Sequence, residues 1–181
     1  MPPTPQSPPL PQEYFIIPVG ASSFKEAMQI GCECYHKLKG IIKKKFGGDA
    51  TSVGDEGGFA PPCDAKEGCA LVTQAIKDAG YDGKCKIGMD VAAAEFLVDG
   101  KYAIDNWYPE KEKDPSMKMG IAELTEFYKG LKKDFPDIET IEDPFDQDDW
   151  DGWTGAPPPC PASRPPPTAS PPTPLPPRPQ Q

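Results

Sequence analysis

The sequence predicts an α/β fold, with a parallel sheet or barrel between two proline-rich ends. Short apolar runs typical of strands alternate with longer stretches whose apolar residues recur at helical spacing. Of the 26 prolines, 19 lie in residues 1–12 and 157–181, where few apolar residues are available to form a core. We therefore expect one folded part, about residues 13–153, between disordered proline-rich segments at 1–12 and 154–181.

Four segments predict the strands. Residues 13–19 and 85–91 are short apolar runs that we expect to form buried strands, with Pro18 near the end of the first. Residues 138–144 predict a further strand, which Pro144 ends. Residues 97–104 contain the Asp-Gly pair that is typical of a tight hairpin.

Three segments predict amphipathic helices. The first covers about residues 24–46, and Ser23 with Glu26 predicts a capping box at its start. Asp64 with Glu67 predicts a second capping box. The apolar residues expected to face the core are Phe24, Met28, Tyr35, Leu38 and Ile42 in the first helix, Leu71, Val72, Ala75, Ile76 and Ala79 in the second, and Ile121, Leu124, Phe127, Tyr128, Leu131 and Phe135 in the third.

Charge and cysteine content restrict the classes of partner. The formal net charge is −9, and residues 137–151 carry eight carboxylates without a lysine or arginine, which argues against nucleic acid and suits hard cations such as Mg²⁺. A solvated acidic face is the alternative reading. The six cysteines form no C-x-x-C pair and His36 is the only histidine, which argues against zinc. With no signal peptide and no apolar run of spanning length, a reduced cytoplasmic protein is expected.

Acidic residues end two of the predicted strands. Asp90 ends "KIGMD", and Glu142 with Asp143 ends "IETIED". In α/β barrels the carboxyl ends of the strands carry the chemistry, so these carboxylates would meet on one rim, where a hard divalent cation could bind. The alternative is that the acids only cap loops or helix N-termini.

The motifs "VGDEGGFAP", "IGMDVAAAEF" and "IEDPFDQDDW" resemble those of enolase, the phosphopyruvate hydratase. "IIPVGASSFKEAMQIG" and "GKYAID" fit the same family in the same order, and the resemblance runs from Glu13 to Trp153. It implies a partial TIM-type barrel, about half of the enolase C-terminal barrel domain. It also implies a cytoplasmic, homodimeric, Mg²⁺-dependent lyase of glycolysis that reversibly dehydrates 2-phosphoglycerate to phosphoenolpyruvate.

The same resemblance assigns roles to four acids. Glu56 matches the proton donor, and Glu13 matches a second catalytic acid that contacts the substrate. Asp90 and Glu142 match metal ligands, with Glu142 also at the substrate. The family's second barrel strand runs antiparallel to the others, which would bring Glu13 to the same rim. A proton donor must stay protonated near neutral pH, and burial and neighbouring acids favour this.

Several positions of the family have no match in this chain. The third metal aspartate and the lysine base would follow Trp153, where proline-rich sequence begins instead. We therefore expect impaired or lost turnover, and dimer formation is also in doubt. Two alternatives stay open: a non-catalytic protein whose proline-rich arms bind SH3 or WW domains, for which "PLPPRPQ" at 174–180 is a weak signal, and a mis-spliced fragment.

Overall fold

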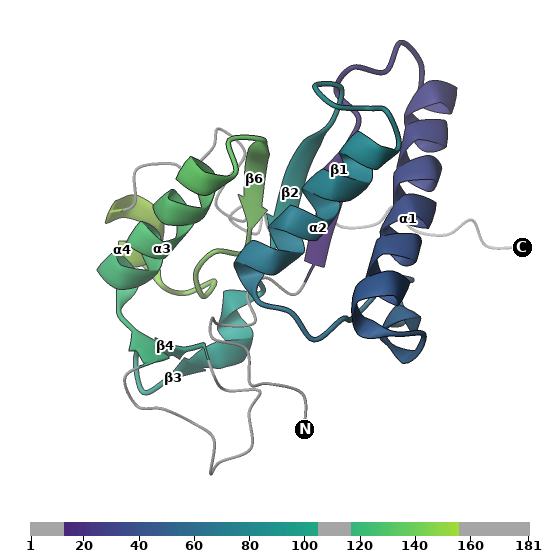
Figure 1. The fold of residues 1–181 in the computed structure, drawn as a ribbon. Coiled ribbons are helices and arrows are strands. Elements are labelled where there is room, and N and C mark those ends of the chain that lie inside the picture. Colours follow the sequence, from purple (N-terminus) through teal and green to yellow (C-terminus); the bar gives the residue numbers. More distant parts are fainter. Residues whose placement is uncertain (1–12, 105–116, 156–181) are drawn as a thin grey trace, which may run out of the picture.

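The computed structural model describes residues 13–104 and 117–155 (Figure 1). The proline-rich segment 1–12, most of the segment 154–181 and the 174–180 motif lie outside these residues. In chain order the elements are β1 Glu13–Ile17, α1 Phe24–Phe46, η1 Asp49–Thr51, α2 Ala65–Asp78, β2 Lys86–Asp90, η2 Ala93–Phe96, β3 Leu97–Val98, β4 Lys101–Ala103, β5 Lys118–Met119, α3 Ile121–Asp134, β6 Ile138–Glu142 and α4 Trp150–Gly155. The last helix ends two residues beyond the boundary expected at Trp153.

The main sheet has three strands in the order β1-β2-β6. β2 and β6 are parallel, and β1 runs antiparallel to β2. The predicted α/β class is confirmed, but the described residues form an open sheet and no closed barrel. A second small sheet joins β3, β4 and β5.

The helices cover one face of the main sheet, with α1 and α2 beside β1 and β2 and with α3 toward β6 (Figure 1). Tyr14 of β1 donates a hydrogen bond from its hydroxyl to the Ala65 carbonyl oxygen at the start of α2 (3.1 Å). Gly68 makes this close packing possible, because a Cβ at this position would lie 2.8 Å from Tyr14 Cε2 and closer still to its hydroxyl. Helix α2 therefore lies directly on β1.

The opposite face of the sheet carries Phe15, Gly88 and Thr140 side by side on the three strands. A Cβ on Gly88 would lie 2.8 Å from Phe15 Cδ2 and 2.9 Å from Thr140 Cγ2. β1 is half-buried along its whole length, so the prediction that it is a buried strand is wrong. The reason is that, among the described strands, only β2 pairs with β1, which leaves its other edge uncovered.

Helix α1 has the predicted bounds but only part of the predicted core face. Ile30, Cys34 and Ile42 are buried, whereas Phe24 and Met28 are 81% and 53% exposed. The capping box is also incomplete. Ser23 Oγ accepts a hydrogen bond from the Glu26 backbone N–H (3.2 Å), but the Glu26 carboxylate accepts from the N–H and hydroxyl of the preceding serine instead of closing the box.

Helices α2 and α3 and the hairpin agree with the prediction. Asp64 Oδ1 accepts from the Glu67 backbone N–H (2.8 Å), so the first half of the second capping box is present. The Asp99-Gly100 pair lies between β3 and β4 with φ of 53° and 73°, the left-handed conformation that a two-residue hairpin turn requires. Tyr128 of α3 donates to the Pro144 carbonyl oxygen (2.9 Å), which ties this helix to the segment after β6.

Candidate functional site

Three of the predicted site residues lie in one row across the main sheet. Glu13 pairs with Asp90 in the antiparallel register of β1 and β2, and Asp90 pairs with Glu142 in the parallel register of β2 and β6. Since neighbouring strands are about 4.8 Å apart, the three Cα atoms lie within roughly 10 Å of each other. β1 is antiparallel, so its first residue lies at the edge where β2 and β6 end. The expected meeting of these acids is therefore present in the fold.

The fourth predicted residue, Glu56, comes from the loop between α1 and α2. Tyr35 of α1 holds this loop by donating from its hydroxyl to the Gly57 carbonyl oxygen (2.7 Å). Gly57 has a φ of 81°, which a residue with a side chain rarely adopts. This turn brings the Glu56 carboxyl close to the Glu13 carboxyl. Glu56 itself is exposed, so its expected burial is wrong, whereas the expected neighbouring acid is present.

The carboxylates where β2 and β6 end and β1 begins affect one another's ionisation. Partial burial, the Glu56 carboxylate and Asp90 together raise the pKa of Glu13. Glu142 is exposed, but partial loss of hydration, Asp90 and Asp143 raise the pKa of its carboxyl. These shifts arise because a buried carboxylate loses hydration and because like charges oppose ionisation. We call these five residues, Glu13, Glu56, Asp90, Glu142 and Asp143, the acidic rim.

The backbone after β2 and β6 fixes two members of the rim. Asp90 Oδ1 accepts a hydrogen bond from the Ala92 backbone N–H (2.9 Å). Ala92 and Asp143 have φ of 47° and 42°, a left-handed conformation that costs free energy for residues with a Cβ. The Val91 N–H donates to the Glu142 carbonyl oxygen (3.0 Å), which continues the pairing beyond the strands. Such strained positions occur often at functional sites.

Asp143 was expected on the rim together with Glu142, which it follows directly, but it was given no catalytic or metal-binding role. Burial and the charge of Asp90 raise its pKa, so it contributes to the electrostatics of the rim. Its adjacency to a predicted ligand was the signal in the sequence. What the sequence did not reveal was the left-handed turn that keeps Asp143 close to Asp90.

A family model described as the enolase C-terminal TIM barrel domain matches residues 10–157. This chain belongs to the enolase family. The match covers the entire row of acids on β1, β2 and β6, and it confirms the resemblance drawn from the motifs. It extends past the last described helix by two residues.

The acidic rim of this enolase-family chain has the donor chemistry for Mg²⁺, which prefers carboxylate oxygens. Asp90 and Glu142 end adjacent parallel strands and could supply two ligands. Within residues 13–104 and 117–155, however, no group of three or more metal-binding side chains is arranged to hold an ion. The residues present therefore fit part of a coordination shell, and water and substrate oxygens would have to complete it.

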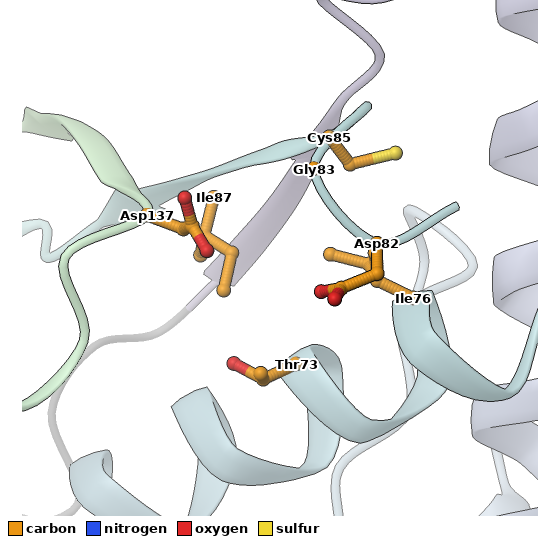
Figure 2. Close-up of a pocket in the computed structure, with 7 residues that line it drawn as sticks. All are labelled: Thr73, Ile76, Asp82, Gly83, Cys85, Ile87 and Asp137. Carbon is orange, nitrogen blue, oxygen red and sulfur yellow. The ribbon is translucent and has the colours of Figure 1, made fainter. Parts of the chain in front are cut away.

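Two hollows lie near the main sheet, and they differ greatly in size. The smaller lies at the opposite ends of β2 and β6, between Asp82, Asp137 and Thr73, and has a volume of about 10 Å³ (Figure 2). This volume holds about one water molecule and excludes a substrate. The larger is a groove of about 890 Å³ between β1, α1, the Glu56 loop and α2, and Glu13 and Glu56 stand on its edge.

None of the described helices combines enough length with enough apolar character to span a bilayer.

Proposed function

We propose that the acidic rim binds Mg²⁺ together with 2-phosphoglycerate or phosphoenolpyruvate, as the family's chemistry implies. The observation that supports this most is the single register row of Glu13, Asp90 and Glu142. Carboxylates from three separate strands of one sheet are held close despite their mutual repulsion. A divalent cation is the group that would relieve that repulsion.

In this proposal Asp90 and Glu142 hold the cation, and the hydrogen bond from the Ala92 N–H keeps Asp90 in position. When bound, Mg²⁺ supplies charge stabilisation for the substrate carboxylate while the proton next to it is removed. Glu56 and Glu13 lie close together in the lining of the groove. That pair can hold the proton needed by the departing hydroxide, with Glu56 as donor and Glu13 in contact with the substrate.

We further propose that this chain by itself dehydrates 2-phosphoglycerate poorly. By the resemblance, the family's lysine base and third metal aspartate would follow Trp153, where the sequence is proline-rich instead. Loss of a general base alone costs about 10²–10⁴-fold in rate. The reaction class would be that of a phosphopyruvate hydratase of cytoplasmic glycolysis, and the family's homodimer is not assumed for this chain.

The test separates binding from turnover in the full chain. Thermal unfolding is followed with and without Mg²⁺ plus 2-phosphoglycerate, and phosphoenolpyruvate formation is followed by its absorbance. We expect a ligand-dependent rise in the unfolding midpoint for the wild type and for Glu56→Gln. Asp90→Asn and Glu142→Gln should lose the rise.

Glu126→Gln is the matched control, since this acid is exposed on α3 and pairs only locally with Lys129. It should behave as the wild type does. An unfolding midpoint of the wild type that does not change with the ligands would overturn the binding proposal. Near-normal turnover would overturn the proposal of poor catalysis.

A further inference from the structure

The groove of about 890 Å³ has aromatic walls. Tyr14 of β1 lines it on one side, and Tyr35 of α1 and Phe59 of the Glu56 loop line it on another. The rings of Tyr35 and Phe59 are stacked, with centroids 4.5 Å apart and planes 26° from parallel. Both tyrosine hydroxyls are engaged with backbone carbonyl oxygens, of Ala65 and Gly57, so the walls are held in place.

The edge of this groove is acidic. Glu13, Asp55 and Glu56 all belong to its lining, and the described lining contains no lysine, arginine or histidine. An apolar aromatic surface beside uncompensated carboxylates suits a ligand with two parts. One part must be apolar and ring-like, and the other must be cationic.

A proline-rich segment that carries an arginine has both parts. The polyproline II helix is already extended before binding and exposes its pyrrolidine rings, so it docks into aromatic grooves at low entropic cost. An arginine next to such a segment can pair with carboxylates at the groove edge.

This chain contains such a segment. Residues 156–181 carry Arg164 and Arg178 and no aspartate or glutamate, whereas the other proline-rich segment, 1–12, has no charged side chain. We propose that residues 171–179, "PPTPLPPRP", dock in the groove of their own molecule, with Arg178 at the acidic edge formed by Glu13, Asp55 and Glu56. This proposal does not depend on Mg²⁺ or on any catalytic role of the rim.

The length of the chain after α4 favours Arg178 over Arg164. Helix α4 ends at Gly155 and lies on the far side of the fold from α1 (Figure 1). From Gly155 to residue 171 is sixteen residues, which span roughly 50 Å in the polyproline II conformation. A folded part of this size is roughly 35–40 Å across, so the segment reaches the groove. Arg164 is only nine residues from Gly155, a span of roughly 28 Å, which is shorter than the folded part is wide.

The experiment is paramagnetic relaxation on the full chain, labelled with ¹⁵N. A nitroxide is attached through Thr173→Cys, in a background where Cys32, Cys63 and Cys160 are replaced by serine. We expect loss of intensity for the backbone amides of Tyr35 and Phe59, at high dilution, and none for Lys129 on α3. Adding Phe59→Ala or Arg178→Glu should restore the lost intensity.

The matched control is Arg164→Glu, which makes the same charge change in the same arm and should leave the loss of intensity intact. Unchanged Tyr35 and Phe59 amides in the labelled wild type would overturn the proposal, as would a loss that survives Arg178→Glu. A second sample mixes nitroxide-bearing chains without ¹⁵N and ¹⁵N chains without the nitroxide. It tests whether the docked proline-rich segment belongs to the same molecule or to another one. Intensity loss in that mixture at equal strength would assign the groove to a second copy and would also overturn it.

Discussion

Glu13 is the residue whose surroundings explain most about the acidic rim. It starts β1, pairs in register with Asp90 and lies close to the Glu56 carboxyl. Each acidic neighbour raises the pKa of its carboxyl, and partial burial adds to the effect. The chain therefore maintains a cluster of like charges, which destabilises the fold at neutral pH in the absence of a cation.

A prediction follows for Asp90→Asn and its pH dependence. Folded-state pKa values above the unfolded ones mean that the folded protein binds more protons, so stability is highest below the ordinary carboxylate pKa and falls as pH rises through the raised values. Removing the Asp90 charge should raise the free energy of unfolding near pH 7 by a few tenths to about 1 kcal/mol, since solvent screens the exposed Glu142.

Urea unfolding near pH 7 and near pH 4 measures this effect. The difference between Asp90→Asn and the wild type should shrink at the lower pH, because Glu13 and Glu142, whose pKa values are raised, bind protons there. A difference that is absent near pH 7, or that grows toward pH 4, would refute the electrostatic account of the rim.

Single elements show how far sequence patterns predict structure. Helical spacing predicted α1 with its bounds and the presence of α2 and α3, because apolar periodicity and cap residues are local signals. The same spacing wrongly placed Phe24 and Met28 in the core. Periodicity identifies which side of a helix is apolar, but a neighbouring element must cover that side before its residues are buried. β5 and α4 are too short to give a periodic signal.

The contact of α2 with β1 predicts opposite effects for two glycines in helices. Gly68→Ala should destabilise the protein by about 1–3 kcal/mol, because its Cβ would overlap Tyr14. Gly40 is its matched control, since it lies within α1 and an added Cβ there would meet no atom within 4 Å. Gly40→Ala should stabilise by about 0.5–1 kcal/mol. Equal effects of the two substitutions in urea unfolding would contradict the packing described for α2.

Two apolar helix residues that were both expected in the core differ in their observed burial. Leu124 of α3 is fully buried, whereas Phe24 of α1 is largely exposed. Leu124→Ala should cost about 2–5 kcal/mol in the free energy of unfolding, because it leaves a cavity. Phe24→Ala should change it by less than about 0.5 kcal/mol. Thermal and urea unfolding measure both changes. A larger loss of stability in Phe24→Ala than in Leu124→Ala would contradict the observed core.

At the scale of the whole molecule, the site depends on strand direction. Apolar runs predicted β1, β2 and β6, and acids at the ends of β2 and β6 suggested a shared rim. Nothing in the spacing of residues shows that β1 is antiparallel, so only the family resemblance predicted that Glu13 lies on that rim. An incomplete barrel was likewise expected only from the resemblance, because local patterns do not show which strands find partners.

The most direct test of the acidic rim is the binding of Mn²⁺, used in place of Mg²⁺ and counted by electron paramagnetic resonance in the presence of 2-phosphoglycerate. We expect the wild-type chain to bind Mn²⁺. The affinity should weaken roughly tenfold or more in Asp90→Asn and Glu142→Gln, by analogy with the loss seen at other metal sites, and should stay unchanged in Glu126→Gln. Equal Mn²⁺ affinity in all four proteins would contradict the claim that the ends of β2 and β6 form a cation site.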